Sequence, residues 1–194
     1  MMVNLVSVYC ASSSKVSDIF KRQAFRLGEL LAERKIAVKY GSGKVGLMGE
    51  LAKGVLSKKG KLIGVIPQFM VDEGWSNPEV TEEIVTETMR ERKYILSKDV
   101  DAVIALPGGV GTLEELMEVI TGRQLGLFKS PVIIVNINHF YDDLLRMFQH
   151  AANENFMRET HLELWKVVDN VEDVLKAIEN ESVLDENVRK FAAI

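Results

Sequence analysis

The sequence predicts an α/β domain with a parallel sheet that is covered by helices on both faces. Short apolar runs rich in β-branched residues alternate with longer amphipathic stretches, which is typical of strands alternating with helices. The apolar runs also lack a regular polar alternation. They are therefore expected to be buried on both faces, as the strands of a parallel sheet are.

Each element can be assigned from its local pattern. Five main strands are expected, at Leu5–Tyr9, Ile36–Tyr40, Leu62–Ile66, Ala102–Leu106 and Val132–Val135. A further strand is expected at Glu82–Val85, and a closing strand and helix at Glu163–Val168 and Glu172–Ile178. Apolar stripes at helical spacing predict the other helices, at Asp18–Arg34, Leu47–Leu56, Met89–Leu96, Leu113–Leu125 and Tyr141–Ala152.

Two segments lack a clean period. The stretch Pro67–Pro78 is expected to be a loop at the carboxyl edge of the third strand, where ligands bind in open parallel sheets, and it is a candidate lid. The chain becomes polar from Glu179 onward. We therefore expect one domain over residues 1–180 and a C-terminal tail over 181–194.

Composition limits the classes of function. The chain has 194 residues and a net charge of −4, with no basic run that could follow a phosphodiester backbone, so nucleic acid is not an expected partner. Cys10 is the only cysteine and is expected to be buried on the first strand. With no disulfide, signal peptide or membrane span expected, the predicted location is the cytoplasm, without a membrane partner.

Two glycine loops carry the functional signal, Gly41–Gly49 and Pro107–Glu115. Each follows a predicted strand and opens a helix, where free backbone N–H groups and the helix dipole can bind phosphate. Taken singly, either loop is equally well explained as a tight turn; two on neighbouring strands favour phosphate binding. Neither carries the Gly-Lys-Ser/Thr ending of a Walker motif, which argues against ATP hydrolysis.

Acidic residues follow the second loop on its helix. Glu114 and Glu115 are neighbours, roughly 100° apart around the helix, so only one can face the loop. A structural alternative is that Thr112 and Glu115, which have capping-box spacing, close the helix start. A carboxylate beside a phosphate cradle instead suits a sugar reaction, because an oxocarbenium-like transition state carries positive charge.

The basic stretch Met89–Lys93 opens the helix before the fourth main strand and is expected near the same edge of the sheet. An arginine there offers a two-pronged donor for phosphate or a charge that steadies a departing base. Taken alone, the stretch is better explained as a solvated charged face.

Together these residues resemble the LOG ("Lonely Guy") family of cytokinin riboside 5′-monophosphate phosphoribohydrolases. The resemblance covers Val6 to Ile178 and rests on the Pro-Gly-Gly-x-Gly-Thr-x-Glu-Glu motif, the Arg92-Lys93 pair and the Gly-Leu-Met-Gly ending of the first loop. It implies a Rossmann-like, doubly wound fold, a homodimer, and release of a free base and ribose 5-phosphate from AMP-type nucleotides.

The resemblance also implies a set of site residues. Arg92 and Glu115 would be the catalytic pair, without a metal or cofactor. The phosphate would be held by Gly108, Gly109, Gly111 and Thr112, and the same pocket would be lined by Met89, Lys93, Ser12, Gly41 and Gly43. Two departures concern the fit around ribose or base: Ser42 and Ala11 stand where the family usually has glycine.

Other features are expected to be structural. Trp75 and Trp165 are interpreted as packing residues in preference to base-stacking platforms, although Trp75 lies in the candidate lid. The three histidines fall on different predicted elements, so a shared metal site is not expected. Members of the family have been labelled lysine decarboxylases, but no sequence context marks a lysine for pyridoxal phosphate. The remaining alternative to hydrolysis is a nucleotide or cofactor carrier or sensor on the same fold.

Overall fold

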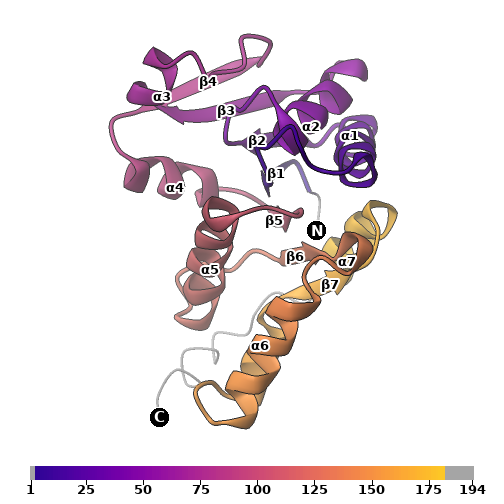
Figure 1. Ribbon diagram of the computed structural model, residues 1–194, viewed down its shortest axis with the longest axis vertical. Coiled ribbons are helices and arrows are strands. Elements are labelled where there is room, and N and C mark those ends of the chain that lie inside the picture. Colours follow the sequence, from indigo (N-terminus) through magenta and orange to yellow (C-terminus); the bar gives the residue numbers. More distant parts are fainter. Residues whose placement is uncertain (1–2, 182–194) are drawn as a thin grey trace.

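A seven-stranded parallel sheet forms the centre of the molecule (Figure 1). The computed structural model describes residues 3–181. The strands lie in the order β4-β3-β2-β1-β5-β6-β7, and every neighbouring pair is parallel. They are β1 (Leu5–Tyr9), β2 (Ala37–Tyr40), β3 (Leu62–Pro67), β4 (Glu82–Thr86), β5 (Ala102–Ala105), β6 (Val132–Val135) and β7 (Lys166–Val168). The predicted Rossmann-like, doubly wound class is confirmed.

Helices cover both faces of this sheet. They are α1 (Asp18–Glu33), α2 (Gly46–Ser57), α3 (Gln68–Asp72), α4 (Met89–Ser97), α5 (Val110–Gln124), α6 (Asp142–Asn153) and α7 (Val174–Asn180). One apolar cluster joins the sheet to α1, α2 and α7, and a second joins it to α4, α5 and α6. Successive residues of β5 alternate between them: Ala102 and Ile104 belong to the first cluster, Val103 and Ala105 to the second.

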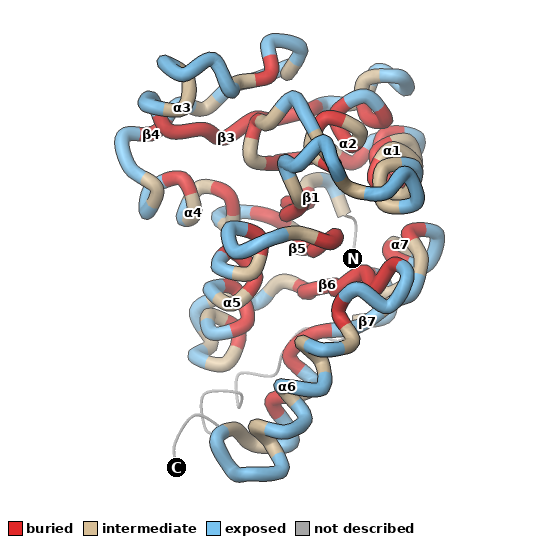
Figure 2. The backbone as a smooth tube through the Cα atoms, in the orientation of Figure 1, coloured by how far each residue is buried: buried red, intermediate tan, exposed pale blue. Residues whose placement is uncertain are grey.

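The direction of winding places a crevice at the middle of the sheet. The chain adds β2, β3 and β4 on one side of β1 and then crosses back to add β5, β6 and β7 on the other. The loops after β1 and β5 therefore diverge toward opposite faces. Figure 2 shows the strands of this central region buried, with the segment around α3 largely exposed.

The structure corrects two element predictions. Residues 163 and 164 are not in a strand: Glu159–Leu164 is a 3₁₀ helix that buries His161 and Leu164, and β7 begins only at Lys166. The candidate lid is not wholly a loop, because Gln68–Asp72 forms the short helix α3 directly after β3.

The described chain ends with α7, which continues to Asn180. The first residue of the predicted tail is tied to the domain, because the Glu181 carboxylate pairs with the buried Arg123 guanidinium at 2.8 Å. The predicted tail beyond this point lies outside the described residues. Within the described range, none of the helices combines the length and apolar character that crossing a membrane requires.

Candidate active site

A cavity of about 790 Å³ lies over the carboxyl ends of the central strands. Its walls come from the segments that follow β1, β2, β3 and β5, together with the start of α4. Most of the residues predicted for the site line it: Ser12, Gly41, Gly43, Met89, Arg92, Gly109, Gly111, Thr112 and Glu115. The structure thus gathers both glycine loops and the acidic and basic side chains around one space.

The start of α5 forms one wall of this cavity. Gly109 is the N-cap residue, and its carbonyl accepts the first helical hydrogen bond, from the Leu113 amide at 3.0 Å. The amides of Val110, Gly111 and Thr112 therefore have no acceptor within the helix. Three backbone donors at the positive end of a helix dipole form a cradle suited to a phosphate group.

A buried ion pair lies next to this cradle. The Arg92 Nη1 atom is 2.7 Å from Glu115 Oε1, and the two side chains are only 7% and 8% exposed. Arg92 Nε donates a second hydrogen bond to the Val65 carbonyl oxygen of β3 at 3.1 Å. The guanidinium is thereby fixed over the sheet edge, and it holds the carboxylate at the cavity wall.

Burial raises the pKa of Glu115 above that of an ordinary glutamate. Loss of solvation is the largest cause, and the nearby positive charge of Arg92 partly opposes it. A glutamate tuned in this way, in a ligand cavity, has the character of a group that exchanges protons or stabilises charge during a reaction.

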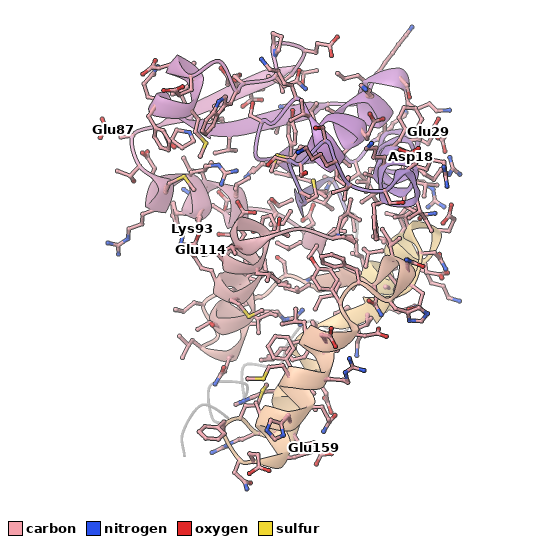
Figure 3. All side chains as sticks on the ribbon, viewed as in Figure 1. Asp18, Glu29, Glu87, Lys93, Glu114 and Glu159 are labelled. Carbon is pink, nitrogen blue, oxygen red and sulfur yellow. The ribbon has the colours of Figure 1, made fainter. Side chains whose placement is uncertain are left out.

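The structural alternative for Glu115, a capping box with Thr112, does not describe this helix. Gly109 occupies the N-cap position and Thr112 lies a turn further on. The Glu115 carboxylate bonds to Arg92 on α4 and not to its own helix end. Its neighbour Glu114 faces away, and Figure 3 shows it beside Lys93 between α4 and α5. Only one of the two adjacent glutamates faces the cavity, as predicted.

Two predicted residues are not among those lining the cavity. Lys93 Nζ lies 2.8 Å from both Glu114 and Glu118 on the outer side of α5, and these carboxylates raise the pKa of Lys93. Gly108 packs under the cradle, because a Cβ atom there would collide with the Thr112 hydroxyl. Lys93 therefore ties α4 to α5, and Gly108 allows the loop to close on the helix.

The two departures from the family pattern have different positions. Ala11 lines the cavity. Ser42 is fully buried with φ +60°, a left-handed conformation that favours glycine, and its hydroxyl donates to Glu83 Oε1 at 3.3 Å. Ser42 can therefore affect the cavity only through the conformation of the first glycine loop.

Several lining residues were not predicted for the site from the sequence. They include Lys44 and Met48, which lie within the first glycine loop, and Met70 and Trp75, which lie in the segment predicted as a lid and of which Trp75 was interpreted as a packing residue. Proximity to a glycine motif was an available signal for the first two. For Met70 and Trp75 the signal is the position of their segment at the carboxyl edge of β3.

These features define a Rossmann-type α/β protein in which the amides of a helix start and a buried Arg92–Glu115 ion pair line one cavity, at the point in the sheet where the strand order reverses. The family model described as "Possible lysine decarboxylase" matches residues 48–178. The cytokinin riboside 5′-monophosphate phosphoribohydrolase LOG2 of Arabidopsis thaliana is 37% identical over 174 residues, which is 90% of this chain and 82% of the relative. The phosphoribohydrolase LOG of Oryza sativa subsp. japonica is 41% identical over 154 residues, covering 79% and 64%. The chain belongs to this LOG family.

Solved structures support the fold. The molybdenum cofactor carrier protein of Chlamydomonas reinhardtii superposes with a TM-score of 0.71 at 19% identity, covering 91% of this chain and 96% of that one. The molybdenum cofactor binding protein of Rippkaea orientalis gives a TM-score of 0.69 at 24% identity, covering 92% and 97%. At these identities the likeness shows the fold alone.

The structure does not single out a lysine for the chemistry that the decarboxylase description of the family model implies. Pyridoxal phosphate needs a lysine amine that can form a Schiff base with it. Among the described cavity-lining residues the only lysine is Lys44, and its Nζ donates to the Gly74 carbonyl oxygen at 2.6 Å. Lys39 is buried in β2 and donates to the Ile95 and Lys98 carbonyls.

Proposed function

We propose that this protein hydrolyses the N-glycosidic bond of a nucleoside 5′-monophosphate, AMP or a cytokinin nucleotide, to a free base and ribose 5-phosphate. The observation that carries the proposal is the buried Arg92–Glu115 pair directly beside the amide cradle of α5. A phosphate held by the cradle brings the attached ribose to the carboxylate. The names of the relatives support the same reaction.

The residues divide the chemistry between them. The amides of α5 and the Thr112 hydroxyl bind the 5′-phosphate. As the bond between C1′ and the base nitrogen breaks, its electron pair leaves with the base, and the Glu115 carboxylate stabilises the cationic sugar. Glu115 orients a water molecule whose oxygen bonds to C1′. One proton of the water is transferred to the departing base, and Arg92 stabilises the negative charge that develops on that base.

The proposal is tested by incubating the protein with AMP and with isopentenyladenosine monophosphate and separating the products by chromatography. Equal amounts of free base and ribose 5-phosphate are expected from at least one substrate. Tight binding of both nucleotides without release of base would favour the alternative, a nucleotide or cofactor carrier.

The cradle itself can be tested at Gly111. A Cβ atom at this position meets no protein atom within 4 Å, so Gly111→Ala is expected to keep the fold, with unfolding free energy unchanged or raised by up to about 1 kcal/mol. The methyl group would crowd a phosphate at the cradle, and nucleotide affinity should fall about tenfold or more. Titration calorimetry measures the affinity.

A matched control is Gly108→Ala, in which the added methyl group collides with Thr112. This variant should lose stability, because its glycine serves packing. If Gly111→Ala bound AMP as tightly as the parent, phosphate could not lie at the start of α5.

We further propose that the protein is a cytoplasmic homodimer. The lone buried thiol of Cys10 fits a reducing compartment. Apolar side chains stay exposed beside a groove of about 950 Å³ along α4 and α5: Tyr94 is 57% exposed and Leu127 is 76% exposed. A second copy that covered this face would remove them from water.

The dimer predicts a sedimentation mass of twice 21.8 kDa. Leu127→Asp should convert it to monomer, because a charge would be buried at the contact. The control is Phe156→Asp, at an apolar position that is 87% exposed and not among the residues lining the groove. A Leu127→Asp protein that remained a dimer would place the contact elsewhere.

A further inference from the structure

Trp75 is a half-exposed indole in the wall of the cavity. It is 53% exposed and lines the same space as Met48 and Met70. The other tryptophan, Trp165, is 5% exposed and packs on Phe148 with ring centroids 4.6 Å apart. The interpretation of both as packing residues is therefore right for Trp165 and wrong for Trp75. An aromatic face left open inside a ligand cavity is available to a ligand.

The backbone that carries Trp75 is fixed to the first glycine loop. Three contacts flank it: Lys44 Nζ donates to the Gly74 carbonyl oxygen at 2.6 Å, Gly43 and Ser76 form an antiparallel bridge, and the Asn77 amide donates to the Ser42 carbonyl oxygen at 2.8 Å. The hydroxyls of Ser42 and Ser76 also share the Glu83 carboxylate as acceptor. The exposed indole is thus presented by an ordered segment, which lowers the entropic cost of binding to it.

An apolar path connects Trp75 to the ion pair. A Cβ atom on Gly41 would touch the Arg92 guanidinium and would lie 3.1 Å from Met48 Cε. A Cβ atom on Gly43 would lie 2.6 Å from Met48 Sδ. Met48 therefore extends from Arg92 to Gly43, whose bridge partner directly follows Trp75. Along this wall Met48 places apolar surface between the Arg92 guanidinium and the segment that carries Trp75, and the Lys44 ammonium lies beside that segment at the Gly74 carbonyl oxygen.

The sheet order sets the cradle and Trp75 apart. The cradle follows β5 and Trp75 follows β3, with β1 and β2 between them. At about 4.8 Å between neighbouring strands, these two strands are about 14 Å apart. A nucleoside 5′-monophosphate carries its phosphate and its base on opposite sides of the ribose. The amide cradle, the Arg92–Glu115 ion pair and the aromatic surface follow the same order as phosphate, ribose and base.

We propose that Trp75 binds the nucleobase of the substrate by stacking, so that this site distinguishes nucleotides from sugar phosphates that lack a base. The assignment rests on the proposed function, which supplies the nucleotide. Stacking of a base on an aromatic side chain accepts any base but requires that one be present. Met48 and Met70 provide polarizable apolar surface in the same cavity.

The test measures binding in a Glu115→Gln background, so that substrate is not consumed. Trp75→Ala should weaken AMP binding about 5- to 150-fold, and Trp75→Phe should weaken it less. Ribose 5-phosphate, which lacks a base, should bind both variants as it binds the parent. AMP should also quench indole emission in the parent and not in Trp75→Phe, where only the buried Trp165 remains.

The matched control is Phe69→Ala, because Phe69 is 49% exposed on α3 and is not among the residues lining the cavity. It should bind AMP normally. Unchanged AMP affinity in Trp75→Ala, or equal loss of AMP and ribose 5-phosphate, would overturn the stacking role. The stacking role and the reaction can fail independently. If the parent protein releases base but Trp75→Ala binds AMP normally, only stacking is refuted. If Trp75→Ala loses AMP affinity but the parent protein releases no base, only hydrolysis is refuted.

Discussion

Replacing Glu115 by glutamine is expected to abolish base release while leaving nucleotide binding intact. The amide has nearly the shape of the carboxylate and can still accept a hydrogen bond from Arg92, so the cavity wall should persist. It carries no negative charge to stabilise the cationic sugar or to orient the attacking water. The loss of both effects predicts a fall in kcat of at least about 10³-fold. Steady-state assays with saturating AMP measure it.

Glu114→Gln provides a control on the adjacent residue. Glu114 is 54% exposed and bonds to Lys93 outside the cavity, so its loss should change kcat by no more than about threefold. Thermal unfolding of both variants checks that each is folded. Unchanged turnover in Glu115→Gln, with AMP still bound, would remove Glu115 from the mechanism.

The order and type of the main elements could be predicted because each has a strong local signal. The β1 and β6 strands, for example, match the expected ranges at both ends. β7 could not be delimited in this way, because it is an edge strand of three residues paired only with β6, and the Leu164 side chain is buried by a 3₁₀ turn. The sequence pattern of so short an edge strand is too weak to show where the strand begins and ends.

The parts of the site in which a motif fixes the backbone could be predicted from the sequence. The parts in which tertiary packing determines which side chain faces the cavity could be predicted less well. The start of α5 follows from the Pro-Gly-Gly stretch, and the facing of Glu115 follows from helical spacing. Lys93 next to Arg92 was expected in the same pocket, but the two side chains leave α4 in different directions, toward Glu114 and toward Val65. Only the packing of α4 against α5 determines which of them reaches the cavity.

Trp75 is a similar case. A tryptophan in an irregular segment is most often a packing residue, and no local spacing separates the two roles. Its exposure depends on the bridge between Gly43 and Ser76, which joins residues more than thirty positions apart. Contacts of that range are not encoded in a local pattern.

Arg92→Met should have the second largest effect on the reaction, a fall of about 10²- to 10³-fold in kcat/KM. Methionine keeps much of the apolar stem but removes the donors to Glu115 Oε1 and to the Val65 carbonyl oxygen. The departing base loses a stabilising charge, and a buried carboxylate loses its counter-ion. Arg90→Met, on the exposed side of the same helix and not among the cavity-lining residues, is the control and should react normally.

The pH profile distinguishes this role from a purely structural one. The carboxylate of Glu115 is the active form, so activity is lost as pH falls through its pKa. Because burial raises that pKa, the acid limb of the wild-type profile should lie above the ordinary glutamate value of about 4.3. Arg92 opposes the effect of burial, so Arg92→Met should move the acid limb to still higher pH. The ratio of the wild-type rate to the Arg92→Met rate should therefore grow as pH falls.

As pH falls, the stability of the folded protein should rise, whereas the activity falls. The folded pKa of Glu115 lies above its unfolded value, so protonation favours the folded state, and stability rises as pH falls through the folded pKa and levels off below the unfolded value of about 4.3. Arg92→Met should lose about 3–5 kcal/mol of unfolding free energy at high pH, where the unpaired carboxylate is charged, and less at low pH, where it is neutral. Denaturant unfolding at several pH values measures this difference. An acid limb that stayed in place, with a stability loss independent of pH, would show that Arg92 and Glu115 are not coupled as the 2.7 Å contact implies.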